Sequence, residues 1–76
     1  MKLFPNPTRG PLNIEFEGVL KELHLTDLSG KILMRWTKPQ QGQRITADLN
    51  MLSTGIYFLR GVGEEEVISK RVVLAR

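Results

Sequence analysis

Apolar and polar residues alternate along most of this chain. In residues 12–16, Leu12, Ile14 and Phe16 share one parity, while Asn13 and Glu15 share the other. Because successive side chains of a β-strand point to opposite faces, this pattern predicts a strand with one buried face. The same alternation, or a run of β-branched and aromatic residues, predicts further strands at 2–4, 22–26, 32–37, 44–49, 56–62 and 66–74.

Glycines punctuate the chain at Gly10, Gly18, Gly30, Gly42, Gly55 and the pair Gly61 and Gly63. Intervals of about 8 to 12 residues suit an all-β sandwich or barrel and leave too little room for crossover helices. No long stretch keeps a helical period, and residues 49–53 are expected to form a single turn. The pattern therefore predicts an all-β fold of seven strands.

Strand phase also predicts which side chains enter the core. Phe16, and Trp36 in phase with Ile32 and Met34, are expected to face inward. His24 falls on a polar face and is expected to be solvated, with no second ligand or nucleophile nearby. Residues 56–59 are apolar on both faces, so this strand is either covered on both sides or exposes an adhesive patch.

Two polar segments have the composition of turns. Residues 27–31 predict a hairpin in which Asp27 accepts hydrogen bonds from the turn backbone and Gly30 takes the left-handed position. In residues 4–10, Pro5 and Pro7 fix the backbone, and Asn6 is expected to bond across the bend. The second segment is either a corner of a sandwich or an exposed recognition label.

Composition narrows the function. With 76 residues, 41% of them hydrophobic, the chain has room for one core and hardly for a deep pocket. The absence of cysteine excludes disulfides and thiol chemistry, and no apolar run approaches the length of a membrane span. A net charge of +3 without a dense basic stripe disfavours nucleic acid, because the arginines are scattered along the sequence.

Candidate catalytic groups are sparse. Glu15 and Glu17 would lie side by side on one strand face instead of across a cleft, and Glu64–Glu66 has the character of a solvated loop. No nucleophile elbow, phosphate loop or metal-ligand spacing is present in the sequence. We therefore expect no enzyme activity, metal or cofactor.

Three blocks of residues resemble the type A C-terminal sorting domain of the type IX (Por) secretion system of Bacteroidetes. The first block is LFPNPT at 3–8, with Gly10 and Leu12 following it. The second block is LHLTDLSGK at 23–31. The third block is LSTGIYFLR at 52–60, with KRVV at 70–73 near the end. The family often has tyrosine where Phe4 stands and an aromatic residue where Thr26 stands.

The resemblance implies a fold and a role. Such domains are immunoglobulin-like sandwiches of seven antiparallel strands in two sheets, so residues 1–76 would form one C-terminal sorting domain of a longer secreted protein. The domain would pass through the periplasm and direct its cargo across the outer membrane, to be secreted or held on the cell surface. Its partners would be the translocation machinery and a sortase-like cysteine peptidase that removes it, without nucleic acid or membrane insertion.

The last two strands are the expected recognition surface. Either Tyr57 and Leu59 or Ile56 and Phe58 would be exposed there, and the free edge of the last strand could join a partner sheet or pair weakly in a dimer. The candidate residues for sorting or partner recognition are Pro5, Asn6, Pro7, Gly10, Asp27, Gly30, Lys31, Gly55, Tyr57, Leu59, Arg60, Lys70, Arg71 and Val72.

Three alternatives remain at this stage. Residues such as Asp27, Gly30 and Gly55 could act only by maintaining the fold. An accessory sandwich that binds a glycan or a protein would need two exposed aromatic side chains on a concave face. A small nucleic-acid-binding barrel would need basic and aromatic residues interleaved on one sheet face.

Overall fold

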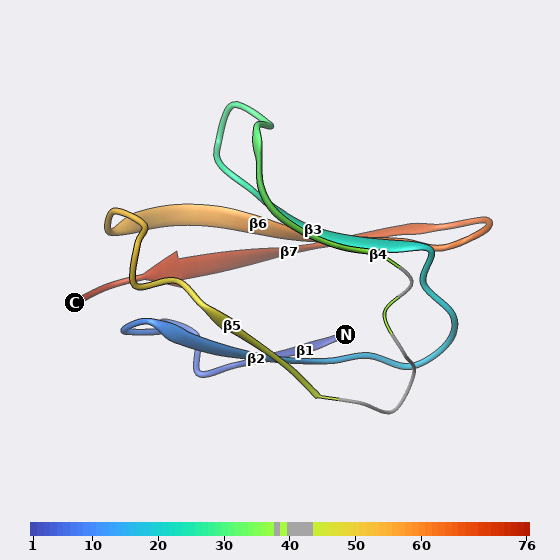
Figure 1. Ribbon diagram of the computed structural model, residues 1–76, viewed down its shortest axis with the longest axis horizontal. Coiled ribbons are helices and arrows are strands. Elements are labelled where there is room, and N and C mark those ends of the chain that lie inside the picture. Colours follow the sequence, from blue (N-terminus) through green and yellow to red (C-terminus); the bar gives the residue numbers. More distant parts are fainter. Residues whose placement is uncertain (38, 40–43) are drawn as a thin grey trace.

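Seven strands form the described part of the chain, which is residues 1–37, 39 and 44–76 of a computed structural model (Figure 1). They match the seven predicted segments to within one or two residues at each end, and the turn signal Gly42 lies outside the described residues. No helix in these residues is long and apolar enough to cross a membrane. The strands are β1 (Lys2–Phe4), β2 (Pro11–Glu15), β3 (Glu22–Thr26), β4 (Ile32–Thr37), β5 (Ile45–Asp48), β6 (Gly55–Val62) and β7 (Val67–Leu74).

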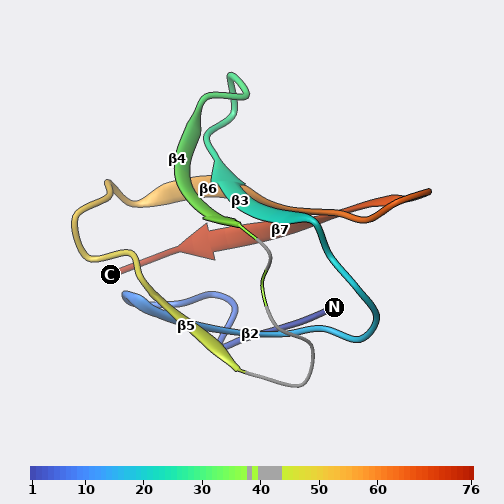
Figure 2. The same cartoon turned by 45° about the vertical axis from the view of Figure 1, so that its right-hand side comes forward.

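The strands pair into two antiparallel sheets that lie one above the other (Figures 1 and 2). The smaller sheet has the order β1-β2-β5, and the larger has the order β4-β3-β6-β7. This arrangement is a β-sandwich of immunoglobulin-like strand order in which β4 joins the sheet of β3, β6 and β7. The predicted fold class is confirmed.

The core lies between the sheets and is built from the inward parity of each strand. Leu12 and Ile14 of β2 face Leu23 and Leu25 of β3, and all four are at most 1% exposed. Burying side chains of this size contributes about 1.5–3 kcal/mol each. Phe16 is also buried, as predicted, whereas Trp36 is half-buried and packs against the core.

The turn before β6 is held by a tyrosine. Tyr57 is buried near the start of β6, and its hydroxyl donates to the carbonyl oxygen of Ser53. The Leu52 N–H donates to the Leu49 carbonyl oxygen at 3.0 Å, which confirms the single turn expected there. A tyrosine that bonds back to the corner preceding its own strand is a recurrent device of immunoglobulin-like sandwiches.

One strand-phase prediction is wrong. Ile32 was expected to face inward with Met34, but it is 38% exposed. Leu25 pairs with Met34, while the next residue, Thr26, pairs with Ile32. The extra residue between them is a β-bulge, which reverses the direction of every side chain beyond it. Ile32 therefore points outward, away from the core.

The prediction that His24 is solvated is also wrong. Its outward direction is as expected, but the side chain is buried, with a relative exposure of 7%. Its Nδ1 is hydrogen-bonded to Oε1 of Glu22 at 3.0 Å. Because β3 is a central strand, Arg35 of β4 and Arg60 of β6 flank His24 in register, and long side chains on both neighbours exclude water.

Candidate functional site

The outer face of the larger sheet gathers charged and apolar side chains that are far apart in sequence. Phe58 of β6 is in register with Thr26 and Arg71, and Arg60 is in register with His24. Residues paired across strands point to the same face, so Phe58 lies among arginines. The expectation that the arginines are scattered is wrong for this face, because strand pairing brings together residues more than ten positions apart.

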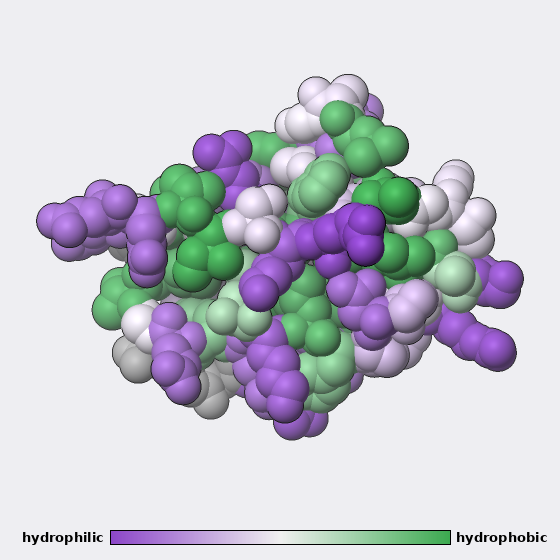
Figure 3. Space-filling view, turned by 180° about the vertical axis from the view of Figure 1, so that it is seen from behind, coloured by the Kyte–Doolittle hydropathy of each residue, from purple (hydrophilic) through white to green (hydrophobic). Residues whose placement is uncertain are grey.

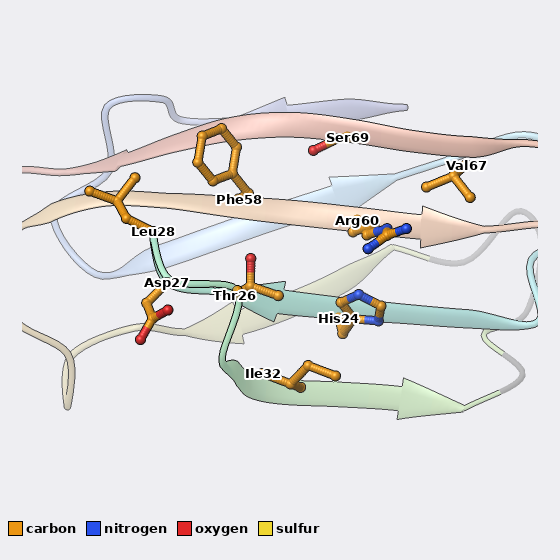
Figure 4. A pocket seen from close by; sticks show the side chains of 10 residues that line it. His24, Thr26, Asp27, Leu28, Ile32, Phe58, Arg60, Val67 and Ser69 are labelled. Atoms are coloured by element: carbon orange, nitrogen blue, oxygen red, sulfur yellow. The ribbon is translucent and has the colours of Figure 1, made fainter.

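A groove runs over this face, bordered by the hairpin between β3 and β4. It has a volume of about 590 Å³, and we call it the outer groove. Figure 4 shows Phe58 and Arg60 on β6, His24 on β3 and Ile32 on β4 standing toward the same side of the sheet. Its lining consists of His24, Thr26, Asp27, Leu28, Gly30, Ile32, Phe58, Arg60, Val67 and Ser69.

The hairpin wall depends on Asp27. Its Oδ1 accepts from the N–H groups of Ser29 at 2.8 Å and Lys31 at 3.0 Å, and from the Ser29 hydroxyl at 2.6 Å. The Ser29 hydroxyl is the main cause that holds the pKa of Asp27 below its ordinary value of 3.8. Gly30 has a φ of 91°, as predicted for the left-handed position. The exposed Lys31 joins this turn through its backbone N–H and carbonyl oxygen, both of which bond to Asp27.

The charges of the outer groove are unequally paired. Oε1 of Glu22 lies 3.0 Å from Nδ1 of His24 and 3.0 Å from Nε of Arg35. The carboxylate of Asp27 is turned into its own loop and away from Arg60 (Figure 4). Within the described residues, Arg60 makes no ion pair. The floor of the groove therefore carries an uncompensated positive charge.

The two faces of β6 are now distinguished. Tyr57 and Leu59 point into the core, as does Val72 of β7, and these three candidate residues are buried. Ile56 is 40% exposed, and Phe58 is half-buried beneath the hairpin. Of the two pairs expected at the surface, only Ile56 and Phe58 face outward. On the face that it draws, Figure 3 shows hydrophobic residues in patches between hydrophilic ones.

The N-terminal corner, residues 5–10, is bound to β7. Nδ2 of Asn6 donates to the Arg71 carbonyl oxygen at 2.8 Å, and its Oδ1 accepts from the Val73 N–H at 3.0 Å. The backbone of Thr8 continues this pairing with Val73 at 2.8 Å and Ala75 at 2.9 Å. The prediction that Asn6 bonds across its own bend is wrong, because its side-chain amide bonds to the backbone of β7 at the edge where a neighbouring strand would otherwise pair.

The corner leaves only part of the β7 edge open. Backbone groups of residues 71, 73 and 75 are paired to the corner, and those of Val67 and Ser69 face the same side because direction alternates along a strand. Within the described residues no strand covers that part, so it is the open stretch of the edge. Lys70 and Arg71 are exposed beside it.

The remaining glycines and prolines among the candidate recognition residues lie in the N-terminal corner and at the start of β6. A Cβ on Gly10 would lie 2.4 Å from Oδ1 of Asn50, so the corner packs closely against the turn after β5. Pro5 and Pro7 are exposed on the corner, and the peptide bonds that precede them are cis. Gly55 opens β6 opposite Leu74 and is exposed.

The acidic side chains considered as candidate catalytic groups do not come together within the described residues. Strand β2 ends at Glu15, so Glu17 does not share its strand face as expected. The Glu15 carboxylate is bound by Arg44, with Nη2 at 2.9 Å from Oε2. Among residues 1–37, 39 and 44–76, no three histidine or acidic side chains form a cluster that could hold a metal ion.

Aromatic side chains do not form the pair that a glycan-binding face would need. Phe58 lies on the outer face of the larger sheet, whereas Phe4 lies on the smaller sheet, with Arg44 centred 5.1 Å from its ring. Trp36 packs against the core. In the part of the chain that the structure describes, Phe58 is the one aromatic residue on the face that bears the outer groove.

Comparison with known proteins gives the identity of the chain. No curated protein matches the sequence significantly. The family model of the secretion system C-terminal sorting domain matches residues 2–75, which includes every strand of both sheets. The match agrees with the three sequence blocks at 3–12, 23–31 and 52–60. The chain belongs to the family of secretion system C-terminal sorting domains, the export signals of the type IX system.

Proposed function

We propose that this domain acts as a folded signal that directs an upstream cargo protein from the periplasm across the outer membrane of a Bacteroidetes cell. The observation that carries the proposal is the family match over residues 2–75. In this proposal the domain is a substrate with no catalytic role and no cofactor. A sortase-like cysteine peptidase would remove it, leaving the cargo secreted or attached to the cell surface.

The outer face of β6 and β7 is the surface that we expect the translocation machinery to recognise. Support comes from Phe58, Arg60 and Arg71, which share this face, and from the open stretch of the β7 edge beside Lys70. On β7, a strand of the partner could pair only with that stretch, because the N-terminal corner occupies the rest of this edge. The same edge would serve for a weak dimer.

The remaining motif residues are proposed to act through the fold. Asn6 and Gly10 hold the corner, Asp27 and Gly30 hold the hairpin, and Tyr57 closes the turn before β6. Buried candidates such as Leu59 and Val72 have no surface that a partner of the folded domain could contact. Their replacement should block secretion only by unfolding the domain.

The function is tested with a fusion of an export signal, a periplasmic reporter and this domain, produced in a host with the type IX system. We expect the reporter to appear outside the cell. Deleting residues 70–76 would also remove Val72 and Leu74 from the core, so a subtler change is needed. The double variant Arg60→Gln/Arg71→Gln removes two exposed charges from the outer face and leaves the core intact.

The matched control is Lys2→Gln/Arg44→Gln, which lowers the net charge equally on the smaller sheet. We expect the outer-face variant to remain folded by circular dichroism but to stay in the periplasm, while the control is secreted. A trapped wild-type fusion would overturn the function. Normal secretion of the outer-face variant, or equal loss in the control, would overturn the choice of surface.

A further inference from the structure

We propose that the outer groove binds an extended acidic segment of a partner protein, with a carboxylate paired to Arg60 and an apolar side chain packed beside Phe58. The inference deepens the proposed function and rests on it, because it names the chemistry of the partner at the same surface. Three features of the groove support it: its charge, its apolar wall and its open shape.

The charge of the groove selects an anion. Glu22 is already shared between His24 and Arg35, and the carboxylate of Asp27 is saturated by its own turn. Within the described residues, Arg60 therefore lines the groove without forming an ion pair, although Asp27 lines the same groove. A guanidinium offers paired donors that match a carboxylate, and its partly apolar surroundings strengthen the resulting ion pair.

The apolar wall selects a side chain beside that anion. Leu28 on the hairpin is 70% exposed, and Ile32, at the start of β4, is 38% exposed. Both line the groove with Phe58, which is half-buried between them and β7. Covering these carbons would stabilise a complex, because apolar surface removed from water contributes about 25 cal/mol per Å².

The shape of the groove favours a peptide over other anionic ligands. A volume of about 590 Å³ lies within the range of ligand pockets, but the groove is an open channel over a sheet face. An acyl chain would strip water from Arg60 and Thr26 and offer them no partner. Single-stranded nucleic acid needs aromatic rings on which successive bases stack. On the described part of this face Phe58 is the one phenylalanine, tyrosine or tryptophan, and the imidazole of His24 is buried.

The test uses the purified, isotopically labelled domain and nuclear magnetic resonance. The probe is a blocked hexapeptide that alternates leucine and glutamate, and its counterpart carries glutamine in place of glutamate. We expect the acidic peptide to shift the amide signals of β3, β6 and residues 27–32. The neutral peptide should bind at least about fivefold more weakly than the acidic one. Binding should weaken at about 0.5 M salt, because the ion pair is partly exposed.

Two variants of equal net charge provide the control. Arg60→Gln should lose the difference between the two peptides, whereas Arg44→Gln, directly before β5 of the smaller sheet, should keep it. Shifts confined to β1, β2 and β5, no binding of the acidic peptide, equal behaviour of the variants, or tighter binding of a thymidine hexanucleotide would each overturn the inference. Should Arg60→Gln fail to fold, the wild-type shift map still decides. If the acidic peptide does not bind but the fusion is secreted normally, the inference about the outer groove is rejected and the proposed function stands.

Discussion

Replacing Asn6 with alanine tests whether the N-terminal corner holds the last strand. The substitution removes the donor to the Arg71 carbonyl oxygen and the acceptor from the Val73 N–H. A net hydrogen bond contributes about 0.5–1.5 kcal/mol, and exposure of Asn6 places both at the lower end, so we expect a loss of about 1–2 kcal/mol. In a domain of this size that lowers the melting temperature by about 5–15 °C.

The assay combines urea unfolding with amide hydrogen exchange. In Asn6→Ala the Val73 amide should exchange faster, while the Ala75 amide, which donates to the Thr8 carbonyl oxygen, should change less. Arg9→Ala is the control, because this exposed neighbour should change stability by no more than about 0.5 kcal/mol. Unchanged stability together with unchanged protection of Val73 would refute the argument that the side chain acts as an edge strand.

Three further predictions concern the hairpin and β6. Gly30→Val should destabilise the domain by about 1–3 kcal/mol in urea unfolding, and Gly30→Asn by less. The cost comes from the backbone, because φ of Gly30 is 91° while no atom lies within 4 Å of the Cβ position. Equal costs for the two variants would contradict this explanation. Folding lowers the pKa of Asp27 from its ordinary value of 3.8, so the ionised carboxylate stabilises the folded domain above pH 3.8. This stabilisation is lost as the pH falls through the folded-state pKa. Unfolding at several pH values should show this dependence in the wild type and a smaller one in Asp27→Asn. Leu59→Ala should lower the free energy of unfolding by about 2–5 kcal/mol, and Phe58→Ala, on the outer face, by clearly less. The reverse order in thermal unfolding would contradict the assignment of Leu59 to the core.

Most of the outer groove could not be predicted from the sequence, because it depends on pairing between strands that are distant along the chain. Arg35, Arg60 and Arg71 are separated by more than ten positions each, and only the register of β4, β3, β6 and β7 sets them on one face. The bulge that turns Ile32 outward adds one residue to one strand, and the alternation pattern alone contains no sign of it.

The partner of Asn6 illustrates the same limit. Its side chain bonds to residues 65 and 67 positions away, whereas sequence reasoning considers first the bonds that a turn residue makes nearby. Asp27 is the opposite case, because its acceptors and donors lie within four residues and were correctly predicted. Local hydrogen bonding is predictable from spacing, while long-range bonding needs the topology.

The sequence by itself determined the strands, the inward faces of β2 and β3 and the hairpin turn, because period-two alternation and turn chemistry depend on neighbours along the chain. The three blocks of residues also determined the family. Only the tertiary structure decided that Tyr57 and Leu59 are core, that His24 is covered, and that Arg60 lies in a groove beside Phe58 with no ion pair to a described residue. Those properties come from which strands are adjacent and in what register, and adjacency is set by packing the whole sandwich.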